Sequence, residues 1–335
     1  NPPYVPTEEV DSDDKVFIST QYEPLYRKYD LSAAFLLRAN SLIHTSGVVA
    51  MITPVAWQTG ENYGQFREAL FCDQSQLLEV VNLPFDVFTD AYIDTCIIIF
   101  GGVRGNASFR AKDYDKHESI SNAEQIEDGH AEIPTSYVSS EPKKKVFLRP
   151  ETYELQRRVR EAKTVSLGDI TDGCQGIVES FYDYSSAKKE SSQLPYYNCD
   201  VYRYEIKITD RKYIFLEDDD KLRKYYTQPR ILFRRLVNRQ DRLMAVYADE
   251  TFIVKKDLNP FILDEGTDLS LLYLLANVNS RLHSHLYVTK SALALKDDFR
   301  QTTLGELRQL PIRDIPFTTP EDERTAHTQA LIDTY

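Results

Sequence analysis

Residues 31–54 have the sequence LSAAFLLRANSLIHTSGVVAMITP, and this stretch sets the expected fold of the first part of the chain. Apolar side chains recur at the spacing of one helix face, which predicts a helix over residues 31–45 with Asp30 or Ser32 as its N-cap. The run that follows, residues 47–54, is continuously apolar and ends in proline. Such a run is typical of a strand buried on both faces in a parallel sheet.

The alternation of helix and strand continues to about residue 100. Residues 60–72 have the apolar spacing of a second amphipathic helix. Residues 76–83 and 93–100 are two further apolar runs, and the second is rich in β-branched residues, which favour strands. Because helices alternate with strands, the pattern indicates an α/β domain.

The composition changes after residue 100. Residues 101–145 are polar and finish in the basic run Lys143–Lys145. We interpret them as an excursion followed by a linker. The lysines at its end either contact phosphates or belong to a solvated tether. The predicted domains are therefore residues 1–145 and residues 146–335.

The second domain has the pattern of an α+β fold. It alternates short β-like segments with amphipathic stretches, and its topology does not follow from the sequence. The expected helices are residues 150–163, 268–287, 303–310 and a closing helix over 322–335.

Charge is distributed unevenly along the chain. The formal net charge is −12, but residues 1–141 hold 9 Lys and Arg against 22 Asp and Glu, whereas residues 142–335 hold 31 against 30. Local potential governs phosphate binding, so the second part can carry a basic face for nucleic acid. Interleaved acids and bases are equally typical of an ordinary solvated surface.

Cysteine and histidine usage argues against disulfides and metals. Cys72, Cys96, Cys174 and Cys199 form no CxxC pair, and no histidine lies at metal-ligand spacing, which fits a reducing cytoplasm. No apolar run approaches the roughly 20 residues of a membrane helix. Because the chain opens at Asn1 without an initiator methionine or a signal peptide, we interpret it as a fragment of a longer protein.

The tetrapeptide Asn1-Pro2-Pro3-Tyr4 carries the clearest chemical signal. The exocyclic amine of adenine is a poor nucleophile, so an enzyme that methylates it must accept hydrogen bonds from the amine and hold the base outside the duplex. The Asn1 side-chain oxygen and the Pro2 carbonyl can accept, while the Tyr4 ring offers a stacking face. The same four residues would also suit an exposed proline-rich segment.

The motifs that follow over residues 1–102 resemble the gamma-type DNA adenine methyltransferases, the TaqI-like and Eco57I-like families. The resemblance implies that the first domain is a partial Rossmann-like methyltransferase sheet, its C-terminal half, from a bacterial type II restriction-modification enzyme. The matching elements are the helix Asp30–Thr45, the Pro-x-x-Trp element Thr53–Trp57, Gly60–Tyr63, Val87–Ala91 and the strand Cys96–Phe100.

The resemblance continues over residues 150–316, which look like a TaqI-like specificity domain. It implies that the second domain recognises a target in double-stranded DNA. The matching segments are Gly173–Ile177, Tyr202–Tyr204, Gln228–Leu232, Leu271–Ser280 and Leu310–Ile312.

Residue roles follow from this resemblance. Asn1, Pro2 and Tyr4 would be catalytic, whereas Pro3 and Phe100 would contact the flipped adenine, although Phe100 also suits an ordinary core. Arginine and glutamine bond bidentately to guanine and adenine. Phosphate contacts and surface salt bridges are the alternatives for such residues. The candidates for DNA binding are Gln175, Arg203 and Arg230, with Arg234, Arg235 and Arg239 as further candidates.

The family binds S-adenosylmethionine through a glycine-containing loop that lies before the NPPY motif. No such loop occurs in this chain, so we expect it to be inactive alone. Three hypotheses stay open: part of a DNA adenine methyltransferase, a DNA target-recognition module without activity of its own, and an unrelated α/β protein. The sequence predicts neither the DNA site, nor a nuclease, nor the oligomeric state.

Overall fold

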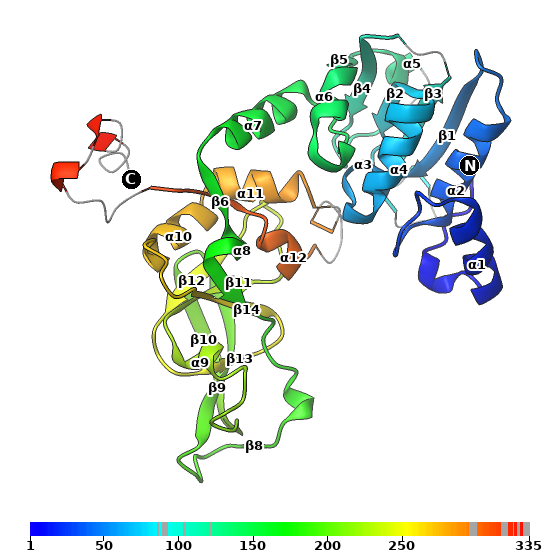
Figure 1. Cartoon of the computed structure of the whole chain (residues 1–335). Helices are drawn as coiled ribbons and strands as arrows, with labels where there is room; N and C mark the ends of the chain where they lie inside the picture. The colour runs from blue at the N-terminus through cyan, green and yellow to red at the C-terminus, as the bar shows by residue number, and fades with distance from the viewer. Residues whose placement is uncertain are drawn as a thin grey trace. The chain divides into compact units, whose positions relative to one another are not determined.

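The computed structural model describes two compact units, Asn1–Arg158 (unit 1) and Val159–Tyr335 (unit 2) (Figure 1). The division falls inside helix α7 (Pro150–Glu161), whereas the predicted domains divide after residue 145. The structure describes the whole chain except residues 86, 89–92, 103–104, 121, 123, 292, 295–299, 316–320, 324, 327–328 and 331–335.

Unit 1 is built on a five-stranded sheet in the order β1-β3-β2-β4-β5. The strands predicted over residues 47–54, 76–83 and 93–100 are confirmed within two residues at each end. The five strands are β1 (Val48–Pro54), β2 (Gln76–Asn82), β3 (Thr95–Gly101), β4 (Ser108–Asp113) and β5 (Ala131–Pro134).

The strand pairing differs from the predicted parallel sheet. β3 lies between β1 and β2 and pairs antiparallel with both, and only β2 and β4 pair in parallel. A parallel pair needs a crossover of a dozen or more residues, usually helical, and the described part of the short β2–β3 connection contains no helix. β1 is an edge strand that is not buried on both faces, since Val48 is exposed and Val49 is buried.

Helices cover this sheet. The predicted helix over residues 31–45 is confirmed as α2 (Leu31–Leu42), and the Asp30 carboxylate caps it by accepting from the Ser32 N–H at 2.9 Å. The predicted helix over residues 60–72 is divided into a 3-10 turn, η2 (Glu61–Tyr63), then α4 and a π-helical turn, η3. The remaining elements are α1 (Ser12–Gln21), α3 (Ala56–Thr59), α4 (Gly64–Arg67), η3 (Glu68–Gln74), α5 (Glu124–Glu127) and α6 (Thr135–Ser140).

The segment 101–145, predicted as an excursion and a linker, instead contributes β4, β5, α5 and α6. Phe109 and Ala111 alternate inwards along β4, and Ile133 on β5 is fully buried. These apolar positions are spaced by the strand period of two and pack against the core of unit 1. Polar residues lie between these positions, and for this reason the sequence pattern did not predict the two strands that complete the sheet.

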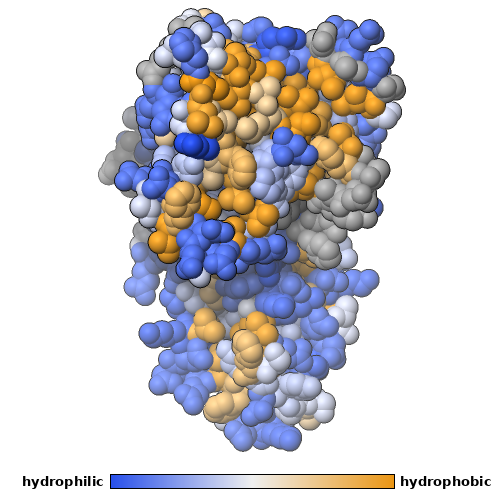
Figure 2. Space-filling view, turned by 90° about the vertical axis from the view of Figure 1, so that its right-hand side faces the viewer, coloured by the Kyte–Doolittle hydropathy of each residue, from blue (hydrophilic) through white to orange (hydrophobic). Residues whose placement is uncertain are grey.

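An apolar surface also lies on one outer face of unit 1. Figure 2 shows hydrophobic residues gathered over the upper part of the molecule in that view. The large apolar side chains that stay exposed on α1, α2 and β1 include Phe17, Phe35, Leu42 and Val48. Extended apolar surface beside an unpaired strand edge is unusual in a free domain.

Unit 2 contains two four-stranded sheets, ordered β13-β9-β10-β8 and β12-β11-β14-β7, and a small β15-β6 pair. Its longest feature is the hairpin of β9 (Gln193–Tyr202) and β10 (Glu205–Phe215). The other strands are β6 (Thr164–Ser166), β7 (Thr171–Gly173), β8 (Tyr184–Ser185), β11 (Arg230–Arg234), β12 (Ala245–Ala248), β13 (Ile253–Val254), β14 (Leu258–Leu263) and β15 (Pro311–Arg313).

The helices of unit 2 pack on these sheets. The predicted helix over residues 268–287 is two helices, because Ser280 caps the second one by accepting from the His283 N–H at 3.1 Å. The predicted helix over 322–335 lies largely outside the described residues. The helices are α8 (Leu167–Ile170), α9 (Lys224–Thr227), α10 (Leu271–Val278), α11 (Arg281–Val288) and α12 (Leu304–Leu307).

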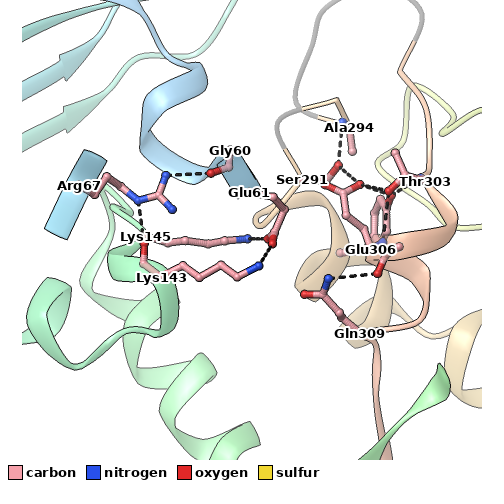
Figure 3. A network of polar contacts seen from close by, with 12 residues as sticks. Gly60, Glu61, Arg67, Lys143, Lys145, Ser291, Ala294, Thr303, Glu306 and Gln309 are labelled. Carbon is pink, nitrogen blue, oxygen red and sulfur yellow. Dashed lines mark hydrogen bonds and ion pairs between the residues drawn. The ribbon is translucent and has the colours of Figure 1, made fainter. Parts of the chain in front are cut away.

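One carboxylate fixes the end of unit 2 that follows α11. Oε2 of Glu306 on α12 accepts hydrogen bonds from Tyr287 at 2.8 Å and from Ser291 and Thr303 at 2.9 Å (Figure 3). These contacts tie α11 and α12 together. In the part of the chain that the structure describes, no helix is long and apolar enough to cross a membrane.

Candidate active site and candidate DNA-contacting residues

The NPPY segment lies against the edge strand β1. The Tyr4 hydroxyl is 2.7 Å from Oδ1 of Asn1 and 3.0 Å from the carbonyl oxygen of Ile52. The hydroxyl has one hydrogen and two acceptors within reach, so it can leave either of them without losing its hydrogen bond. Asn1 and Pro3 are exposed, Pro2 is buried, and the Tyr4 ring is half-buried.

The residues after Tyr4 are held by backbone pairing with the start of α2. The Leu31 N–H donates to the Val5 carbonyl at 2.8 Å, and the Thr7 N–H donates to the Tyr29 carbonyl at 2.9 Å. The Thr7 hydroxyl also donates to that carbonyl and accepts from the Tyr29 N–H. These bonds fix the direction in which the NPPY segment meets the sheet.

The Gly60–Tyr63 motif contacts the start of α2, where the residues after Tyr4 also pair. The Tyr63 hydroxyl oxygen accepts from the Asp30 N–H at 2.8 Å. Arg67, fully buried, donates to the carbonyls of Trp57 at 2.7 Å, Gly60 at 3.0 Å and Lys143 at 2.9 Å, and so fixes the backbone of the motif (Figure 3).

Glu61 closes this network. Its carboxylate forms ion pairs with Lys143 and with Lys145, the latter at 2.6 Å (Figure 3). These lysines lower the pKa of the half-buried Glu61 although burial alone would raise it. Lys144 donates to the Ser139 carbonyl at 2.8 Å, so all three lysines predicted as a tether or phosphate contact have partners within unit 1.

The site electrostatics keep the two tyrosines protonated. Burial, followed by the nearby Cys96 and Asp30, raises the pKa of Tyr4, and burial raises the pKa of Tyr63 to about 12. Both hydroxyls therefore remain neutral hydrogen-bonding groups near pH 7. The site offers neutral acceptors rather than an ionised base.

Phe100 does not join this group. It is fully buried, its ring packs edge-on against Phe71 at 5.9 Å, and it pairs with Val49 on β1. Tyr4 reaches β1 three residues further along, at Ile52, a separation of about 10 Å along a strand. In this structure Phe100 is a core residue with no face open to a base.

The candidate DNA-contacting residues of unit 2 divide into buried and exposed ones. Arg230 is fully buried and donates to the carbonyls of Gln228, Glu250 and Phe252 at 2.9–3.0 Å. Its guanidinium also lies 4.4 Å from the centre of the Phe252 ring, and burial lowers its pKa to about 10. Arg230 therefore stabilises the backbone around β11 and has no donor at the surface.

Gln175 and Arg203 are exposed, as a DNA contact requires. Gln175 donates to the Lys256 carbonyl at 3.0 Å. Arg203 lies at the tip of the β9–β10 hairpin, 5.5 Å from the ring centre of Tyr204. These two residues belong to different segments, and no described contact joins them.

The further arginine candidates differ in the same way. Arg234 is half-buried, 5.6 Å from the ring centre of Tyr202, and Arg239 is exposed. The sequence did not single out Arg242 or Arg281, although the positive charges of Arg203 and Arg281 both act on Arg242. No local motif marks them, because only the fold brings their three segments together.

The glycines that could suggest a cofactor loop are filled by protein. A Cβ on Gly101 or Gly102 would lie 2.8 Å and 2.7 Å from the carbonyl oxygens of Gly47 and Thr45. A Cβ on Gly176 would overlap the Lys255 carbonyl. Among the described residues no group of three or more His, Cys, Asp or Glu side chains could hold a metal ion.

Comparison with known proteins gives a family match within each unit. The Eco57I restriction-modification methylase model matches residues 1–88, and the TaqI-like C-terminal specificity domain matches residues 194–312. The first part of the chain is therefore similar to a restriction-modification methylase, and the second part is similar to a TaqI-like specificity domain. The resemblance to the Eco57I-like and TaqI-like families that the motif order predicted is confirmed.

One relative extends across both parts. A Methanocaldococcus jannaschii protein, named as a type II restriction enzyme and methyltransferase, is 37% identical over 294 residues. The match includes 85% of this chain and 25% of that protein, so the chain spans a quarter of its relative's length.

Two solved structures align with this chain, and the first of them has a related fold. The type IIL restriction-modification enzyme MmeI, in complex with DNA, aligns with 92% of this chain and 45% of its own at 12% identity and a TM-score of 0.61. The type IIG restriction endonuclease BpuSI aligns with 100% of this chain and 48% of its own at 12% identity and a TM-score of 0.40.

Proposed function

We propose that this chain is the target-base and DNA-recognition part of a site-specific DNA adenine N6-methyltransferase. The observation that carries the proposal is the pair of Asn1 and Tyr4 against the Ile52 carbonyl, within the segment that matches the restriction-modification methylases. In this proposal the five-stranded sheet of unit 1 is the C-terminal half of a Rossmann-like methyltransferase sheet.

The chemistry of the site concerns the adenine amine. Its lone pair is delocalised into the ring, so it becomes nucleophilic only when its hydrogens are held by acceptors that favour a tetrahedral nitrogen. Oδ1 of Asn1 and the carbonyl of Pro2 serve as those acceptors, and the Tyr4 ring stacks on the flipped base. When the amine takes Oδ1 of Asn1, the Tyr4 hydroxyl keeps the Ile52 carbonyl as its acceptor.

The methyl donor in this family is S-adenosylmethionine. Gly101, Gly102 and Gly176 pack against backbone carbonyls and do not fit a loop that cradles this cofactor. We therefore assign the cofactor to sequence outside residues 1–335, as the much longer relative allows. Unit 2, with its specificity domain, binds double-stranded DNA in this proposal.

The proposal is tested by Asn1→Ala in the full-length methyltransferase. Removal of the acceptor should lower single-turnover N6-methyladenine formation by at least a thousandfold, because the interaction acts on the transition state. DNA affinity should stay within about twofold, since unit 2 is unchanged. Methylation is followed by mass spectrometry of digested DNA, and affinity by fluorescence anisotropy.

Asn40→Ala is the matched control. Asn40 lies on α2, where its side chain donates to Gln74 at 3.1 Å on the surface. This variant should keep the wild-type rate. Turnover of Asn1→Ala near the wild-type level, or methylation at a cytosine, would overturn the proposal.

A second function is favoured by the filled glycines: the chain alone acts as a DNA-recognition module. Equilibrium dialysis of the full-length protein with labelled S-adenosylmethionine distinguishes the two, because a pure module binds DNA but retains no cofactor. Methyl transfer by the isolated chain would exclude this second function.

A further inference from the structure

Three arginines from separate segments converge near the start of β12. Arg203 comes from the β9–β10 hairpin tip, Arg242 from the loop before β12, and Arg281 from the first residue of α11. Burial lowers the pKa of Arg242, and the positive charges of Arg203 and Arg281 lower it further. We call these three residues the arginine cluster.

The backbone of Ala245 joins the three segments. Its carbonyl accepts from the Tyr204 N–H at 3.0 Å and from the Asn279 side chain at 2.9 Å, and its N–H donates to Oδ1 of Asn279 at 2.9 Å. The Asn279 carbonyl in turn accepts from Nη2 of Arg242 at 2.8 Å. The convergence is thus built into the fold and does not depend on flexible side chains alone.

The hairpin tip is also fixed in conformation. Tyr204 has φ of 67°, a left-handed conformation that is uncommon for a residue with a side chain. Its ring is exposed and lies beside Arg203. Two-residue hairpin turns commonly contain such a conformation, and here the turn holds Arg203 and Tyr204 in a defined position at the surface.

The arginine cluster is not neutralised within the described residues. Other arginines of unit 2 have carboxylate partners: Arg300 pairs with Asp241 at 2.5 Å and Arg223 with Asp218 at 2.9 Å. No salt bridge joins a carboxylate to any member of the cluster in the described part of the chain. Nε of Arg242 is buried and has no acceptor there. Like charges held together in this way favour a polyanion.

Resting on the proposed function, we propose that the arginine cluster is a phosphate-binding site of the specificity domain that grips the DNA backbone. Guanidinium groups bind phosphate oxygens bidentately, and phosphate contacts fix the register of a protein on the duplex without selecting its sequence. The cluster therefore sets affinity and orientation, and the bases are recognised by other residues.

The test measures binding of this chain to short fluorescent DNA duplexes of unrelated sequence at a series of KCl concentrations. Arg203→Gln and Arg281→Gln are used because both side chains are exposed, so both variants should fold. Each should weaken binding to all duplexes alike, by about tenfold. Each should also reduce the slope of log affinity against log salt by about one.

Lys221→Gln is the matched control. Lys221 is exposed and follows the acidic run Glu217–Asp220, so removal of its charge should change neither affinity nor slope. Arg203→Lys should lie between wild type and Arg203→Gln, since it keeps the charge but loses the planar fork.

The outcomes separate this inference from the function on which it rests. If wild type binds and both glutamine variants bind equally well, the arginine cluster is not a phosphate site, while the proposed function stands. A changed preference among the duplexes with an unchanged salt slope would assign these arginines to bases and overturn the inference. If the wild-type chain binds no duplex even at low salt, the proposed function itself is wrong, and the inference that rests on it is wrong as well.

Discussion

The NPPY region of unit 1 and the arginine cluster of unit 2 offer opposite chemistry. The first presents neutral oxygen acceptors, with Oδ1 of Asn1 and the Ile52 carbonyl grouped about the Tyr4 hydroxyl. The second presents positively charged donors, with Arg203 and Arg281 near Arg242. Acceptors suit an amine, and donors suit a phosphate.

Under the proposed function, this difference divides methylation into two tasks, one for each region. A charged group beside the adenine amine would have to be desolvated with the base, whereas neutral acceptors avoid that penalty. A phosphate at the surface is bound from solvent, where positive charge attracts it over distance. We therefore expect variants of the first region to change the rate and variants of the second to change the affinity.

The largest expected effect tests whether Arg230 has a structural role or contacts DNA. Arg230→Met leaves the carbonyls of Gln228, Glu250 and Phe252 without their donor, which should destabilise unit 2 by about 3–5 kcal/mol. Urea unfolding followed by circular dichroism measures the loss. The single tryptophan, Trp57, lies in unit 1, so its fluorescence reports on that unit separately.

Arg203→Met is the control, because an exposed arginine should shift stability by no more than about 0.5 kcal/mol. The Trp57 transition should stay in place in both variants. Should Arg230→Met unfold like wild type and yet bind DNA less tightly, Arg230 would be a DNA contact and the division between buried and exposed arginines would be wrong.

The next effect sharpens the role of the acceptors. Tyr4→Ala removes the stacking face and should lower the single-turnover methylation rate of the full-length enzyme by about ten- to a hundredfold. Tyr4→Phe keeps the ring and removes only the hydroxyl, so the rate should stay within about threefold. A loss in Tyr4→Phe as large as that in Tyr4→Ala would show that the hydroxyl, and not the ring, is the functional group.

These two regions also mark what the sequence could predict. The NPPY motif was recognisable because consecutive residues carry it, and the strands β1, β2 and β3 were recognisable because continuous apolar runs form them. Their antiparallel pairing was not, since strand direction depends on which segments become neighbours. β4 and β5 were missed because polar residues interrupt their alternation.

The donors were predictable only in part. Arg203 and Arg230 lie in similar aromatic and apolar surroundings in the sequence, yet one is exposed and the other fully buried. Arg242 and Arg281 carry no local signal, because they meet Arg203 only through the backbone of Ala245 and the side chain of Asn279. Pairwise contacts between distant segments cannot be deduced from spacing along one chain.

The smallest expected effect concerns the helix that carries Arg281. His283 on α11 is buried, with Nε2 at 2.8 Å from the Pro311 carbonyl and Nδ1 at 3.1 Å from the Ser280 hydroxyl. Burial lowers its pKa below the usual 6.5, although the Pro311 contact acts in the opposite direction. The folded protein therefore binds this proton less readily than the unfolded chain does.

The neutral His283 thus stabilises unit 2 fully above pH 6.5, and this contribution is lost as the pH falls below 6.5 towards the folded-state pKa. The loss should not exceed about 1.4 kcal/mol per pH unit. His283→Gln, which keeps a donor for Pro311, should flatten this part of the pH dependence of urea unfolding, while His285→Gln on the exposed side of α11 should not. Equal pH slopes for wild type and His283→Gln would show that titration of the buried imidazole does not change the stability of unit 2.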